Sequence, residues 1–215
     1  MNTKERILQY MKENDMPPMF EKDLMEALEV ELYSTERAMF QNILRDMVEE
    51  GSLIQTKKGK YGLPEQLGFI TGRLQGNAKG FGFLIPDDEE AEDIFIAAEN
   101  MNGAMHNDRV MVRLLKKSLD EKRAREGEVY KVLVHANETV VGTFEQSRYF
   151  GFVVPDDGRI YEDIFIPKDE FHGARTGHKV VAQIVKWPEK RRNPEGRIIE
   201  ILGHKDDLGT DILSI

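Results

Sequence analysis

Two short motifs in this chain alternate aromatic residues with glycine, about seventy residues apart. Residues 79–83 read Lys-Gly-Phe-Gly-Phe, and residues 148–152 read Arg-Tyr-Phe-Gly-Phe. Each motif is followed by the same five residues, Glu-Asp-Ile-Phe-Ile, at 92–96 and at 162–166. Because alternate residues of a strand share one face, the rings of each motif and of the strand that follows it can gather on one surface.

The chemistry that such a surface supports is base stacking. Aromatic rings beside a cation suit a flexible single-stranded nucleic acid, because every base has a face to stack, at roughly 1 to 3 kcal/mol per base. We therefore predict two binding platforms. For Phe95 and Phe165, a place in the core of the domain is an open alternative. The candidate contact residues are Lys79, Phe81, Phe83 and Phe95 in the first copy and Arg148, Tyr149, Phe150, Phe152 and Phe165 in the second.

The repeat extends well beyond the aromatic motifs. Both copies carry a Pro-Asp-Asp turn, at 86–88 and at 155–157, between the two aromatic segments. Further matches follow, at 107–110 with 177–180 and at 127–129 with 196–198. Five short strands in each copy, separated by such turns, predict two small barrels of the OB type.

Residues 1–63 follow a different pattern. Apolar residues recur at helical spacing near the start and over 35–50, with a short helix predicted at 21–28 between them. Two short strands, at 53–56 and 61–63, then enclose the basic tip Lys57, Lys58, Gly59 and Lys60. Three helices followed by a hairpin predict a winged helix-turn-helix, with Lys57, Lys58 and Lys60 as candidate nucleic-acid contacts. A role in packing or protein interaction alone is an open alternative.

The predicted fold class is therefore α+β with several domains. We expect a winged helix-turn-helix at 1–63, one five-stranded OB barrel at 64–135, a second at 136–204, and a linker at 205–215. Each unit is small enough to be only modestly stable alone.

Composition limits the function classes. The chain has 30 basic and 39 acidic residues, so its net charge is −9 and it is not a basic domain. Phosphates respond mainly to cations within a Debye length of about 10 Å, so we expect weak, salt-sensitive binding from local cations. The absence of cysteine and of a long apolar run favours a cytoplasmic protein with no membrane partner.

The motifs support a resemblance to a known family. Residues 79–83 with 94–96 resemble the paired ribonucleoprotein motifs of cold-shock domains, and 148–152 with 164–166 resemble a less faithful copy. The histidine usual after the second motif is replaced by Ala97 and by Pro167. A winged helix-turn-helix followed by two cold-shock domains is similar, over essentially the whole chain, to the amino-terminal region of the bacterial ribonuclease R family.

That resemblance implies a role in RNA decay. In the family, a catalytic domain follows, and its clustered aspartates bind magnesium and hydrolyse RNA from the 3′ end. The resemblance implies that this chain captures single-stranded or structured RNA, helps to unwind it and feeds it to that domain. Within the chain itself we expect no catalytic residue, metal or cofactor, because its carboxylates lie in turns and its histidines are scattered. The resemblance also suggests a monomer that meets the ribosome or the RNA-decay machinery.

Two other functions are left open by the residues. One is a free-standing RNA-binding regulator or RNA chaperone with cold-shock domains. The other is a structural lid whose domains pack against protein without touching RNA. Continuation of the reading frame into an aspartate-rich domain would favour the nuclease over the regulator.

Overall fold

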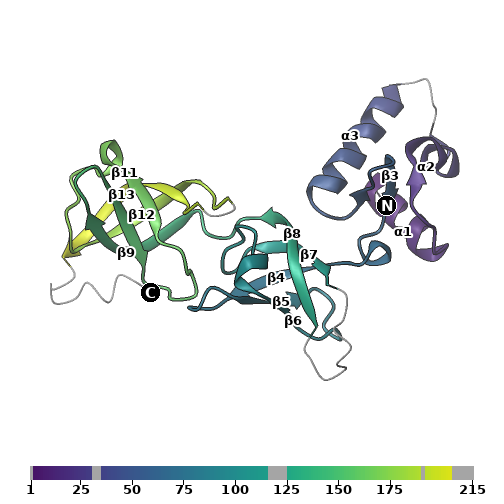
Figure 1. Ribbon diagram of the computed structural model, residues 1–215. Helices are drawn as coiled ribbons and strands as arrows, with labels where there is room; N and C mark the ends of the chain where they lie inside the picture. The colour runs from purple at the N-terminus through teal and green to yellow at the C-terminus, as the bar shows by residue number, and fades with distance from the viewer. Residues whose placement is uncertain (1, 31–34, 116–124, 190–191, 205–215) are drawn as a thin grey trace. The chain divides into compact units, whose positions relative to one another are not determined.

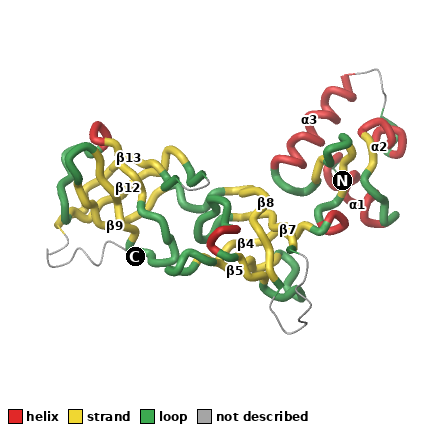
Figure 2. The backbone as a smooth tube through the Cα atoms, in the orientation of Figure 1, coloured by secondary structure: helices red, strands yellow, loops and turns green. Residues whose placement is uncertain are grey.

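The computed structural model describes residues 2–30, 35–115, 125–189 and 192–204, so the predicted linker at 205–215 lies outside the described residues. The backbone forms two compact units. One unit is Met1–Thr71 with Met111–Leu114, and the other is Gly72–Val110 with Leu115–Ile215. Helices dominate the first part of the chain and strands the rest (Figure 2).

The amino-terminal part contains the three predicted helices and the predicted hairpin. Helix α1 starts with a capping box, in which the Asn2 side chain accepts a hydrogen bond from the Glu5 backbone N–H at 2.9 Å and the Glu5 carboxylate accepts one from the Asn2 backbone N–H. Strand β1 was not predicted, and it completes a three-stranded antiparallel sheet in the order β1-β3-β2. The elements are α1 (Thr3–Glu13), β1 (Met19–Phe20), α2 (Glu21–Ala27), α3 (Thr35–Glu49), β2 (Ile54–Gln55) and β3 (Lys60–Gly62) (Figure 1).

The two sequence repeats form two closed five-stranded barrels, as predicted. Their strand orders, β4-β5-β6-β8-β7 and β10-β11-β13-β12-β9, describe the same ring of neighbours. In both, the third and fifth strands pair in parallel, whereas the hairpin of the first two strands is antiparallel. The first barrel consists of β4 (Phe69–Gly76), β5 (Gly82–Pro86), β6 (Ile94–Ile96), β7 (Arg109–Leu114) and β8 (Glu126–Val134). The second consists of β9 (Thr139–Gln146), β10 (Phe150–Pro155), β11 (Ile164–Pro167), β12 (His178–Lys186) and β13 (Glu195–His204).

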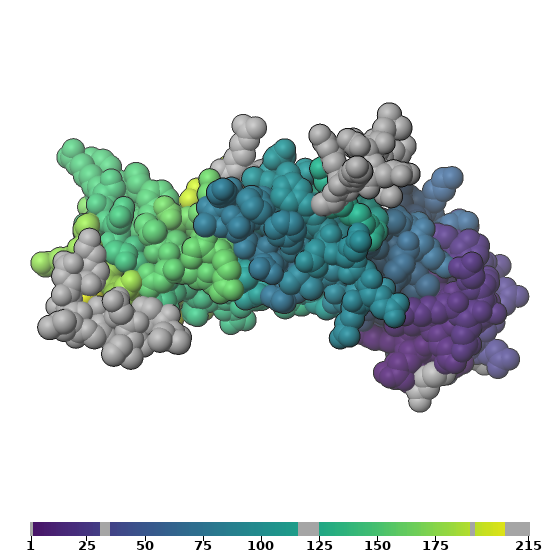
Figure 3. All heavy atoms as spheres, turned by 90° about the horizontal axis from the view of Figure 1, so that it is seen from below, coloured from purple at the N-terminus to yellow at the C-terminus, as the bar shows by residue number. Residues whose placement is uncertain are grey.

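Each barrel is built from one continuous stretch of the sequence. In the space-filling view the first barrel is blue to teal and the second is green to yellow (Figure 3). The core of the second barrel is a cluster of buried apolar side chains that includes Phe144, Ile164 and Ile166. These residues alternate along their strands with outward-facing ones, as a period of two requires.

The Pro-Asp-Asp turns have a structural use that the sequence did not reveal. Asp87 accepts two hydrogen bonds from Arg109, at 2.9 and 2.8 Å, and Asp156 accepts one from Lys179 at 2.7 Å. These two pairs occupy equivalent positions in the two barrels. Asp87 and Asp156 are exposed turn carboxylates, and their ion pairs also tie the turn to the fourth strand.

The glycine within each aromatic motif has a packing role that differs between the barrels. At Gly151 an added Cβ would lie 2.6 Å from Cζ of Phe144, a fully buried ring. At Gly82 the nearest atoms are the Gln75 oxygen at 3.0 Å and the end of the Leu74 side chain at 3.2 Å.

We expect Gly151→Ala to destabilise the protein by about 1 to 3 kcal/mol, because a buried aromatic ring in a closed barrel cannot move aside freely. Gly82→Ala should lower the free energy of unfolding by less, because the neighbouring Leu74 side chain can shift. Urea unfolding of the two variants and the wild type measures the difference. Equal free energies of unfolding for the two variants would contradict this account.

Candidate nucleic-acid interface

The first aromatic motif forms a three-ring platform. Phe83 on β5 pairs directly with Phe95 on β6, and Phe81 lies just before β5. The ring centroids are 5.8 Å apart for Phe81–Phe83, 5.6 Å for Phe81–Phe95 and 5.7 Å for Phe83–Phe95. Phe83 is 37% exposed and the other two are half-buried, whereas the adjacent Ile94 and Ile96 are fully buried. The three rings therefore lie on the outer face of the strands, as the period of two predicts.

The second motif forms a matching platform. Phe152 pairs with Phe165 across β10 and β11, and Phe150 completes the group. The centroid distances are 5.6 Å for Phe150–Phe152, 5.8 Å for Phe150–Phe165 and 5.8 Å for Phe152–Phe165. Phe165 lies outside the buried core cluster of this barrel. The alternative that placed Phe95 and Phe165 in the core is thus not what the structure shows.

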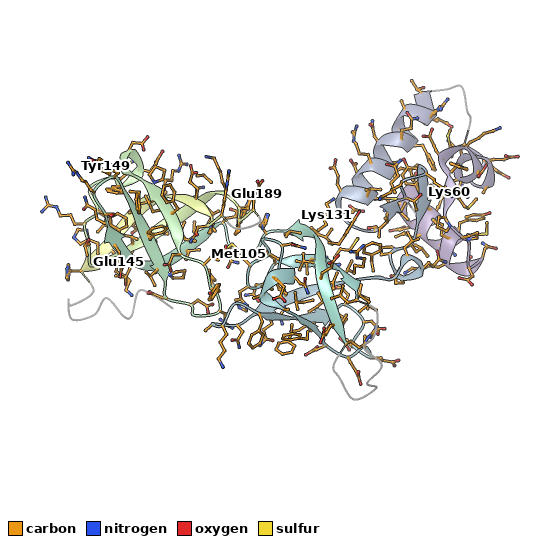
Figure 4. The ribbon with its side chains drawn as sticks, in the orientation of Figure 1. Lys60, Met105, Lys131, Glu145, Tyr149 and Glu189 are labelled. Atoms are coloured by element: carbon orange, nitrogen blue, oxygen red, sulfur yellow. The ribbon has the colours of Figure 1, made fainter. Side chains whose placement is uncertain are left out.

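The cations predicted beside the platforms are exposed. Lys79 lies in a tight turn, where its backbone N–H donates to the Asn77 side chain at 3.0 Å. In the second barrel, the Arg148 guanidinium lies over the Tyr149 ring, 5.1 Å from its centroid. Tyr149 is 66% exposed and points away from the second barrel (Figure 4). The Tyr149 ring and the Arg148 guanidinium therefore lie together, next in sequence to the second platform.

Both platforms have a glutamate opposite one ring, Glu126 opposite Phe95 and Glu195 opposite Phe165, but the second has an additional one. Glu145 on β9 is the cross-strand partner of Phe152. Burial, with the nearby charge of Glu145 as the second cause, raises the pKa of Asp163. Burial alone raises the pKa of the neighbouring Glu162 carboxyl. Carboxylates beside the rings repel phosphate, so this platform should bind a nucleic acid more weakly than the first.

The predicted wing residues lie at the tip of the β2–β3 hairpin. Lys57 and Lys58 are exposed, and the Lys60 ammonium lies 4.9 Å from the centroid of the Phe20 ring (Figure 4). On α3, Arg37 is paired with Glu21 at 3.3 Å, which offsets its charge. The hairpin tip is therefore one basic surface of this part of the chain.

A buried polar centre near the end of the first barrel was missed from the sequence. Asp108 is fully buried and accepts hydrogen bonds from the backbone N–H groups of Met105 and Ala136, both at 2.9 Å. Its carboxylate also lies 3.1 Å from Nδ1 of His135. The His135 ring in turn stacks on Trp187, with centroids 3.7 Å apart and planes 5° apart. No local pattern marks Asp108, because two of its three partners, Ala136 and His135, come from a distant segment.

Within the described parts of the chain, no three or more histidine or acidic side chains are grouped so that they could hold a metal ion. No helix in these parts is long and apolar enough to cross a membrane.

Comparison with known proteins agrees with the geometry. Residues 72–132 match the family described as the ribonuclease B OB domain, and residues 152–215 match the cold shock domain family. Ribonuclease R of Escherichia coli (strain K12) is 33% identical over 211 residues, which are 97% of this chain and 25% of that protein. Ribonuclease R of Thermotoga maritima is 31% identical over 99% of this chain and 29% of that protein.

Solved structures share the fold at lower identity. RNase R of Mycoplasma genitalium, in its apo form and in complex with ribose methylated single-stranded RNA, superposes with a TM-score of 0.60 at 21% identity over 67% of this chain and 23% of that one. Yeast Ssd1, a pseudonuclease, gives a TM-score of 0.57 at 22% identity over 70% of this chain and 24% of that one.

The chain spans about a quarter of the length of the curated relatives it matches. Nearly all of its residues align with those proteins, and both barrels match domain families of nucleic-acid-binding type. By sequence and by fold, the chain belongs among the relatives of bacterial ribonuclease R.

Proposed function

We propose that this chain binds single-stranded RNA through its two aromatic platforms and acts as the RNA-capturing part of a 3′-to-5′ exoribonuclease. The observation that carries the proposal is the pair of three-ring groups, each with centroid distances of 5.6 to 5.8 Å and one exposed ring, Phe83 or Phe150. Stacking of this kind tolerates any base sequence, which suits an enzyme that degrades many RNAs.

The relatives support the identity of the ligand. The Mycoplasma genitalium protein with the same fold was solved with single-stranded RNA, and the sequence relatives are ribonucleases. In such an enzyme the catalytic step requires magnesium held by a separate catalytic domain, and this chain would deliver the strand to it. We place the protein in the cytoplasm, as a monomer that works on structured or single-stranded RNA and meets the ribosome or the RNA-decay machinery.

Within this proposal the three domains have different tasks. The barrels at 64–135 and 136–204 bind the strand. The first should contribute more to the affinity, because the cross-strand partner of Phe83 on β4 is the neutral Gln75, whereas that of Phe152 on β9 is Glu145. The domain at 1–63 adds a basic tip, Lys57, Lys58 and Lys60, that approaches phosphates. A free-standing RNA-binding regulator is the second candidate function. It would bind RNA through the same residues.

Salt dependence tests the phosphate contacts. Fluorescein-labelled oligo(U) is titrated with the 215-residue chain at 50 and at 200 mM salt, and anisotropy is recorded. The two barrel contacts, from Lys79 and Arg148, should contribute about −1.4 to the slope of log K against log salt, which is roughly a sevenfold loss of affinity, and each wing lysine that reaches a phosphate should add about −0.7.

A matched variant gives the control. Lys79→Gln combined with Arg148→Gln should flatten the slope while leaving the stacking rings in place. Absence of binding at 50 mM salt would sink the proposal, and salt-independent binding would show that the phosphate contacts are assigned wrongly.

A further inference from the structure

The outer face of the second barrel carries a row of side chains that crosses four strands. Each residue of the row is the register partner of the next: Glu145 on β9, Phe152 on β10, Phe165 on β11 and Glu195 on β13. Neighbouring strands lie about 4.8 Å apart, so the two rings lie between two carboxylates. Phe150, which is 37% exposed, lies against both rings, 5.6 Å from Phe152 and 5.8 Å from Phe165. The second platform is therefore an aromatic surface with a carboxylate at each end.

The corresponding row of the first barrel is less acidic. Its members, in the same strand order, are Gln75, Phe83, Phe95 and Glu126. Two residues before Gln75, on the same face of β4, lies the exposed Arg73, whereas Thr143 lies two residues before Glu145 on β9. From the first barrel to the second, this edge of the platform therefore loses one positive charge and gains one negative charge.

The charges around the second platform favour a cation. Glu145 is exposed, and among the described residues it has no ion-pair partner, whereas Glu195 pairs with the exposed Lys186 at 2.9 Å. Asp163 lies two residues before Phe165, and its pKa is raised first by burial and second by the charge of Glu145. That second cause shows that the negative charge of Glu145 reaches β11, across the strand that carries the rings.

We propose that the second platform binds an arginine-rich segment of a partner protein, whose guanidinium groups stack on Phe152 and Phe165 and pair with Glu145. A planar guanidinium both stacks on an aromatic face and donates two parallel hydrogen bonds to a carboxylate, and this row offers both groups side by side. Within the chain, the Arg148 guanidinium already lies over an aromatic ring, 5.1 Å from the centroid of Tyr149.

This proposal goes beyond RNA binding and does not depend on it. The carboxylates that repel phosphate at the second platform attract a cationic segment, so the two platforms differ in the ligand that they prefer. RNA and the arginine-rich segment would compete for the second platform, while the first stays available to RNA.

The test titrates a short fluorescein-labelled peptide of alternating arginine and glycine with the 215-residue chain, without RNA, and records anisotropy. Glu145→Gln should weaken binding by about two- to fivefold, as expected for one exposed ion pair. Phe152→Ala should weaken it by about two- to thirtyfold, because it removes a ring on which a guanidinium stacks. Glu200→Gln removes the same charge from an exposed position of β13 outside the row, so its affinity should equal that of the wild type. A peptide with lysine in place of arginine should bind more weakly than the arginine peptide.

A charge swap in the first barrel gives a gain-of-function control. Arg73→Thr combined with Gln75→Glu gives the first platform the charges of the second, so calorimetry should detect a second bound peptide per chain.

Two results would overturn the proposal. One is the absence of peptide binding by the wild type. The other is an equal affinity for Glu145→Gln and Glu200→Gln, which would show that the peptide follows only the net charge of −9. Oligo(U) binding is measured separately on the same proteins. A chain that binds oligo(U) but no peptide loses this proposal alone, and one that binds the peptide but no oligo(U) loses the RNA-binding function alone.

Discussion

Replacing Phe81 and Phe83 together by alanine should weaken the binding of oligo(U) by roughly thirtyfold or more, since each stacked base contributes about 1 to 3 kcal/mol. Both rings lie on the outer face of the first barrel, within 5.8 Å of each other. Their loss removes stacking surface while leaving the buried residues Leu84, Ile94 and Ile96 in place. Anisotropy titration at 50 mM salt measures the change.

The matching double variant, Phe150→Ala with Phe152→Ala, should weaken the binding of oligo(U) by a smaller factor. Glu145 pairs across from Phe152, and Asp163 lies close enough to Glu145 for its pKa to be raised by that charge as well as by burial. These acidic groups oppose phosphate at the second platform. Unchanged binding by the Phe81 and Phe83 variant would contradict the stacking account, and a larger loss in the second barrel would reverse the ranking of the two platforms.

The second large effect concerns stability. Asp108→Ala should lower the free energy of unfolding by about 3 kcal/mol, because it leaves the buried N–H of Met105 and the part-buried N–H of Ala136 without their acceptor. It also releases His135, which lies 3.1 Å from the carboxylate and stacks on Trp187. Since Trp187 is the only tryptophan, its emission should change in the folded variant. Urea unfolding followed by Trp187 fluorescence measures both effects.

A conservative variant serves as the control for Asp108. Asp108→Asn keeps one acceptor oxygen, so its loss of stability should fall between those of the wild type and of Asp108→Ala. An alanine variant that unfolds at the same urea concentration as the wild type would show that the buried hydrogen bonds contribute nothing.

Features with a short sequence period were predictable. The two platforms follow from the alternation of residues along strands, and the barrels from the repeat of turns, so neither needs knowledge of distant contacts. The third helix, predicted over 35–50, spans Thr35–Glu49 in the structure. These features depend on local geometry, which the residue types specify directly.

Features that depend on distant partners were not predictable. Strand β1 has only two residues and pairs with β3 across some forty positions of the chain. Asp108 meets Ala136 and His135 only after the first barrel has closed. The ion pairs of Asp87 and Asp156 were not predictable, because their cationic partners, Arg109 and Lys179, lie more than twenty residues further on. A single sequence carries no signal for such pairs.

Photocrosslinking tests the central claim most directly. Oligo(U) with single 5-iodouridine substitutions is irradiated with the 215-residue chain at low salt, and the attachment sites are mapped by mass spectrometry. We predict crosslinks at Phe81, Phe83 and Phe95, and fewer at Phe150, Phe152 and Phe165. Crosslinks confined to the outer faces of β12 and β13, away from both three-ring groups, would contradict the account.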